Sequence, residues 1–147
     1  MTRVAALALG VFAAGCSLQT YAIVQPRFRT QEAATAFERV VQAVDAHCGG
    51  VESSNPEARV VIGRWQLWSA ADGASVSQCI VTLFSDESGS EHLGEVRVTF
   101  SVRKCPLSDV SDVEALAPTC ERTDVVTHLV STELSVIAQR LEADVRR

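Results

Sequence analysis

The side chains that could act as acids, bases or nucleophiles are scattered along the chain. The three histidines, His47, His92 and His128, lie in separate segments. Only the stretch "SGSEH" brings a serine, a glutamate and a histidine together, as Ser90, Glu91 and His92. Neighbours within one turn rarely form a proton relay, and the chain carries no nucleophile-elbow, zinc-protease, phosphate-loop or dinucleotide motif. We therefore expect a protein that is not an enzyme and that needs no cofactor.

Two acidic turns and the cysteines contain side chains of the kinds that bind metal ions. Asp86 with Glu87, and Asp109 with Asp112 and Glu114, lack the alternating ligand spacing of a calcium loop. The cysteines form no CxxC pair, and no histidine stands at zinc-ligand spacing from them. We expect solvated turns at these positions and no metal site.

Four of the five cysteines favour disulfide chemistry. Cys48, Cys79, Cys105 and Cys120 are an even set, which is typical of an oxidising compartment, and they allow three pairings. Spacing favours Cys105 with Cys120, because these two bracket a loop whose closure contributes about 3 kcal/mol in the chain-entropy model. Cys48 and Cys79 would then pair by default.

The fifth cysteine follows a segment with the organisation of an export signal. Arg3 precedes an apolar run over residues 4–14, which is shorter than the roughly 20 residues that cross a bilayer as a helix. The tetrad Ala13–Cys16, "AAGC", resembles the lipobox of bacterial lipoproteins, with Ala13 in place of the usual leucine. The resemblance implies that residues 1–15 are a cleaved signal peptide and that Cys16 carries a lipid anchor. A cleaved signal with an unmodified Cys16 is the alternative.

The same resemblance implies a location. An aspartate directly after the lipidated cysteine would favour retention in the inner membrane. Ser17 stands there instead and is compatible with export to the outer membrane. We therefore expect a lipid-anchored protein of the outer membrane that faces the periplasm, with the inner membrane less favoured. Residues 16–29 would form a lipidated tether with a reach of at most about 45–50 Å. The net charge of −5 disfavours nucleic acid as a partner.

Residues 30–147 have the length and patterning of a single domain. Apolar residues recur at helical spacing from Thr30 to Gly49-Gly50 and again from Val126 to Val145. Between them, "ARVVIGRWQLW", "VSQCIVTLFS" and "EVRVTFSVRK" are strand-like segments separated by polar turns. This order predicts an α+β domain: a helix, a three-stranded antiparallel meander and a C-terminal helix, with both helices packed on one sheet face as two layers.

Alternation along the strands predicts which side chains point toward the helices. On the first strand we expect Val61, Gly63, Trp65 and Leu67 to point inward. The opposite set would leave an apolar face, rimmed by arginines, that can bind a partner. Alternatively, the tether or the loop between the paired cysteines covers this face, or a β-bulge redirects some of its residues. The set comprises Val60, Ile62, Trp68, Val76, Ile80 and Phe84, with Arg64, Arg97 and Arg103 as the rim.

The order of elements over residues 30–147 is similar to the helix-grip domains of small periplasmic lipoproteins in envelope assembly machinery. A shared fold does not carry function with it. The anchor, the short tether, the apolar sheet face and the lack of a catalytic motif instead favour a non-catalytic interaction or accessory module of the cell envelope with an envelope protein as partner. The alternative is a carrier that holds a lipid or small ligand between the sheet and the C-terminal helix.

Overall fold

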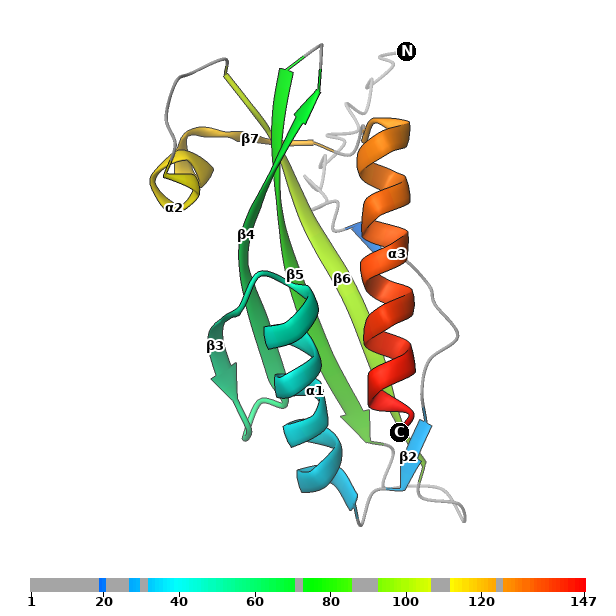
Figure 1. Cartoon of the computed structure of the whole chain (residues 1–147). Helices are drawn as coiled ribbons and strands as arrows, with labels where there is room; N and C mark the ends of the chain where they lie inside the picture. The colour runs from blue at the N-terminus through cyan, green and yellow to red at the C-terminus, as the bar shows by residue number, and fades with distance from the viewer. Residues whose placement is uncertain are drawn as a thin grey trace, which may run out of the picture.

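A computed structural model describes residues 19–20, 27–29, 32–70, 73–85, 93–106, 112–123 and 126–147. Cys16 and the expected signal peptide lie outside the described residues. The chain has the α+β architecture that the sequence predicted (Figure 1). Its main elements are α1 (Ala33–His47), β4 (Val60–Ala70), β5 (Gly73–Ser85), β6 (Leu93–Cys105) and α3 (His128–Val145).

The meander β4-β5-β6 forms the middle of a larger antiparallel sheet. At one edge β3 (Val51–Asn55) pairs with β4. At the other edge β6 pairs with β1 (Gln19–Thr20), β2 (Arg27–Arg29) and β7 (Glu121–Arg122). The expectation of three strands was therefore too low. The additional strands are two to five residues long, too short for alternation to reveal them in a sequence.

The helix ends follow local backbone chemistry. Gly49 and Gly50 follow Cys48, the C-cap of α1, with φ of 71° and 105°, a conformation that glycine adopts without strain. Thr127 precedes α3, and its hydroxyl accepts a hydrogen bond from the Val130 N–H at 3.4 Å. Thr30, where the helical spacing of the sequence begins, lies outside the described residues, and α1 begins at Ala33.

One buried cluster joins the two helices to the sheet. α1 and α3 pack against each other, and buried side chains of both helices belong to the same cluster as side chains of β4, β5 and β6. Val61, Val81 and Val98 occupy opposing positions on the three strands and are all buried in it. Alternation along the strands therefore does separate a buried set of residues from the rest.

A second, smaller cluster forms around the segment between β6 and β7. This segment contains α2 (Val113–Leu116) and the 3₁₀ helix η2 (Ala117–Thr119). Asp112 caps α2, because its Oδ1 accepts hydrogen bonds from the backbone N–H groups of Glu114 and Ala115. A disulfide joins Cys105 to Cys120, as the spacing predicted. It holds Leu116 and Ala117 against Val76 of β5.

Candidate functional site

A β-bulge in β4 decides which of its side chains reach each face of the sheet. Ile62 lies opposite Ile80, but the next regular pair is Trp65 with Gln78, so two residues of β4 stand against one residue of β5. Beyond the bulge the alternation is inverted. The expectations that Trp65 and Leu67 point inward and that Trp68 points outward were therefore wrong. Trp68 packs against the main core, and its Nε1 donates a hydrogen bond to Ser77 Oγ at 2.7 Å.

The bulge contains Gly63, which lies against two cysteines. A Cβ on Gly63 would stand 2.7 Å from the Cys48 Cβ and 3.4 Å from the Cys79 Cβ. The expected disulfide between Cys48 and Cys79 is not formed, and both are buried free thiols. Packing of the end of α1 on β5 brings the two side chains together as hydrogen-bonded thiols. That hydrogen bond, together with burial, raises the pKa of Cys79 well above its ordinary value.

One half of the sheet's outer face is covered by the disulfide-closed segment. Here the outer face is the side whose residues alternate with the core set. Val76 lies on this face and is fully buried with Leu116 and Ala117. Arg103 stacks 4.6 Å from the centre of the Trp65 ring, and its Nη1 donates to the Ala117 carbonyl at 2.9 Å. The loop therefore covers part of the apolar face, one of the alternatives that the sequence left open.

The other half of the outer face carries four apolar side chains that belong to neither buried cluster. We call Val60, Ile62, Ile80 and Phe84 the outer patch. Val60, Ile62 and Ile80 are half-buried, whereas Phe84 is 44% exposed. Since Ile62 and Ile80 are direct cross-strand neighbours, the patch is continuous across β4 and β5.

The three arginines expected to rim this face are separated. Arg97 borders the outer patch: its Cζ lies 4.6 Å from the centre of the Phe84 ring, and its Nη2 lies 3.6 Å from Glu95 Oε1. Arg103 instead covers Trp65. Arg64 lies in the bulge beside Gly50, whose carbonyl accepts its backbone N–H at 3.0 Å. Only Arg97 thus remains a charged neighbour of the outer patch among the three.

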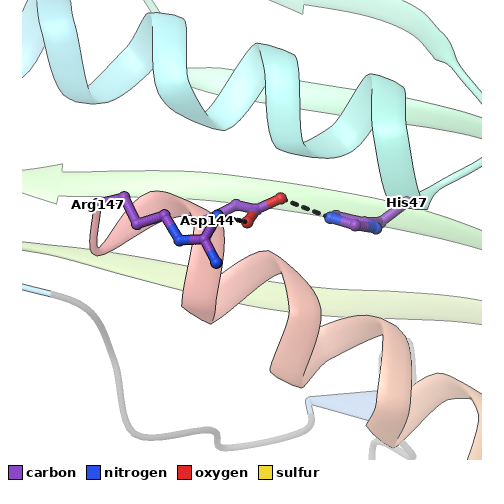
Figure 2. Close-up of polar contacts among 3 residues, drawn as sticks. All are labelled: His47, Asp144 and Arg147. Atoms are coloured by element: carbon purple, nitrogen blue, oxygen red, sulfur yellow. Dashed lines mark hydrogen bonds and ion pairs between the residues drawn. The ribbon is translucent and has the colours of Figure 1, made fainter.

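Two of the three histidines, His47 and His128, lie in the described residues. His47 Nε2 lies 2.7 Å from Asp144 Oδ2, and Arg147 Nη1 lies 3.8 Å from the other carboxylate oxygen (Figure 2). The hydrogen bond from His47 lowers the pKa of Asp144. Sequence reasoning missed this pair, because 97 positions separate its members. His128 is exposed in the first turn of α3.

The remaining candidates for catalysis or metal binding either lie outside the described residues or belong to the segment around α2. Ser90, Glu91 and His92 lie outside the described residues, as do Asp86, Glu87 and Asp109. Asp112 serves as a helix cap, and Glu114 is exposed. Within the described part of the chain, no three His, Cys, Asp or Glu side chains are grouped so that they could hold a metal ion.

No model of a protein family matches the chain, and a search of curated proteins returns no match. Of the helices that the structure describes, none combines the length and the apolar character needed to cross a membrane.

Proposed function

We propose that this protein is a non-catalytic interaction module of the bacterial cell envelope, anchored through a lipid on Cys16 at the periplasmic side of the outer membrane. The lipobox-like tetrad Ala13–Cys16 supports the anchor. The observation that carries the interaction role is the outer patch, which remains outside both buried clusters while α2 and η2 cover the other half of the same face.

The proposed module has two layers, with α1 and α3 on one face of the sheet and the outer patch on the other. Support comes from the cross-strand pairs. The set Val61, Val81 and Val98 packs in one cluster with both helices, whereas Ile62 and Ile80 alternate with that set. A partner would therefore approach from the side opposite the helices.

The chemistry of the outer patch favours a protein segment that presents apolar and acidic side chains. Complete burial of a Val, Ile or Phe side chain contributes about 1.5–3 kcal/mol relative to exposure. Aromatic and arginine side chains dominate many binding interfaces. Phe84 and Arg97, already stacked on each other, are thus the two residues that we expect to contribute most.

A carrier function receives less support from the packing. The groove expected between the sheet and the C-terminal helix would be lined by Phe100 of β6 with Leu134 and Leu141 of α3. These three side chains are fully buried in one cluster. They already fill the space that a ligand would need.

Site-specific photocrosslinking tests the interaction role in intact cells. A photoreactive residue in place of Phe84 is expected to give a discrete protein adduct, and Ile80→Glu should abolish that adduct by placing a charge in the patch. The same photoreactive residue at Gln42, an exposed position of α1, is the matched control. Identical adducts from positions 84 and 42 would contradict the proposed patch.

The anchor needs a separate readout. The intact mass of the mature chain should correspond to a protein that begins at Cys16 and carries acyl groups. A Cys16→Ala variant should lose both the acyl mass and the membrane association. A mature chain with an unmodified Cys16 would contradict the anchor and leave the test of the outer patch intact.

A further inference from the structure

We infer that the end of the domain formed by β7 and the first turn of α3 rests on the membrane surface, with Leu129 in contact with lipid. This inference rests on the proposed anchor at Cys16. It adds the orientation of the domain and a second, protein-borne contact with the bilayer.

The connection between the proposed anchor and the sheet is short. β1 pairs with β6 through Gln19 opposite Phe100 and Thr20 opposite Thr99. The chain is therefore fixed to the domain three residues after Cys16. Three residue steps span at most about 11 Å, far less than the reach of a free tether over residues 16–29. A lipid on Cys16 thus holds the edge of β6 close to the bilayer.

The place where β1 pairs with β6 shows which end of the domain lies nearest the anchor. The same edge of β6 pairs with β7 a few residues further on, where Arg103 lies opposite Arg122 and Lys104 opposite Glu121. The Thr123 N–H also donates to the Val102 carbonyl at 3.2 Å. β1 and β7 are thus near neighbours on one edge, so the end of the sheet that carries β7 is the end nearest the anchor.

The end of the domain that carries β7 exposes side chains that suit a membrane surface. α3 starts shortly after β7, and Leu129 in its first turn is 58% exposed. Lys104 and Arg122 are also exposed, with Glu121 as the neighbouring acid. An end of the domain that exposes an apolar side chain and basic side chains suits the interface of a bilayer, where the apolar group enters the acyl boundary and the cations meet lipid phosphates.

The acidic residues of α2 do not oppose this contact directly. Asp112 and Glu114 lie at the start of α2. The apolar residues of α2, Val113 and Leu116, pack on the face of the sheet opposite the core that holds α3. Figure 1 shows β7 and the start of α3 at one end of the molecule, and β2 and the C-terminus at the other. The long axis of α3 therefore runs from the proposed membrane-facing end to the far end.

α3 provides positions at increasing distance from the proposed membrane surface. Its 18 residues extend over about 27 Å. A photoreactive residue is placed at Leu129, at Arg140 or at Arg147, which are exposed positions at the start, along the middle and just beyond the end of α3. The full chain is used in cells that lipidate it, and lipid adducts are detected by mass spectrometry. We expect lipid adducts at position 129 and only background at positions 140 and 147.

The outcomes separate the two proposals. An acylated mature chain with equal lipid adducts at the three positions, or with the highest yield at 147, overturns the orientation but leaves the anchor. A mature chain without acyl groups overturns the anchor and the orientation together. The intact mass is measured on the same samples, so the two failures are distinguishable.

A second variant tests the role of the short connection. A long Gly/Ser insertion between Ser17 and Leu18 leaves Cys16 and the residues of the domain unchanged, and it allows the domain to move away from the membrane. The lipid adduct at Leu129 should fall to background while acylation persists. An insertion of the same length in the exposed Glu57-Ala58 turn between β3 and β4 is the control and should retain the adduct. Full retention in the first variant would contradict the inference.

Discussion

His47 and Asp144 join the last turn of α1 to the last turn of α3, with 2.7 Å between Nε2 and Oδ2 (Figure 2). A carboxylate near a helix C-terminus is unfavourable on its own, because the helix dipole places partial negative charge there. His47 and Arg147 offset this by surrounding Asp144 with donors. The pair thereby fixes how the two helices of the core meet at this end.

Replacement of Asp144 by asparagine tests this contact through its pH dependence. The pKa of Asp144 is lowered in the folded protein by the hydrogen bond with His47. Between that pKa and the unfolded value of about 3.9, the unfolded state binds more protons, so stability rises with pH. The contribution is present above the unfolded value and is lost as the pH falls through the folded one.

We therefore expect Asp144→Asn to melt below the wild type at neutral pH and at the same temperature at strongly acidic pH. Thermal unfolding followed by circular dichroism across this range measures the difference. Glu133→Gln, which neutralises an exposed carboxylate of the same helix, is the control. A difference that stays constant from neutral to acidic pH would show that Asp144 acts through packing alone.

Gly63→Ala is expected to destabilise the protein. The added Cβ would stand 2.7 Å from the Cys48 Cβ, inside a fully buried contact, so the end of α1 or the bulge must move. Overpacking of this kind costs about 1–3 kcal/mol. Denaturant unfolding measures the loss, and Ser69→Ala at an exposed position of the same strand serves for comparison. An unchanged free energy of unfolding for Gly63→Ala would mean that the bulge is not held by this contact.

Removal of the disulfide should weaken both stability and the cover over the outer face. The double variant Cys105→Ala, Cys120→Ala frees a loop of 15 positions, which lowers the free energy of unfolding by about 3 kcal/mol. Because Leu116 and Ala117 then cover Val76 and Trp65 less firmly, acrylamide should quench tryptophan fluorescence more strongly. Unchanged quenching and stability would indicate that α2 stays in place without the bond.

Cys48 and Cys79 are expected to resist alkylation in the folded protein. Both thiols are buried, and their mutual hydrogen bond helps raise the pKa of Cys79, so little reactive thiolate forms. Iodoacetamide should add to neither residue under native conditions and to both after unfolding without reductant. A failure to label them after unfolding would show that they are oxidised rather than free.

Local patterns along the chain were enough to locate several elements. Helical spacing of apolar residues located α1 and α3, and alternation in "EVRVTFSVRK" located β6, whose alternating apolar residues are all buried: Val96, Val98, Phe100 and Val102. The spacing of Cys105 and Cys120 indicated their bond. Each of these signals is contained within one element or one loop, so it can be read without knowing what lies opposite.

Other features depend on which residues meet across the fold, and no single segment predicts them. The bulge at Gly63 is defined by its register with β5, so alternation in β4 alone placed Trp65, Leu67 and Trp68 on the wrong faces. The contact of His47 with Asp144, the free thiols of Cys48 and Cys79, and the pairing of Gln19–Thr20 with β6 likewise join distant parts of the chain. Such contacts form because packing brings these side chains and strand edges together, and no local pattern of residues encodes that packing.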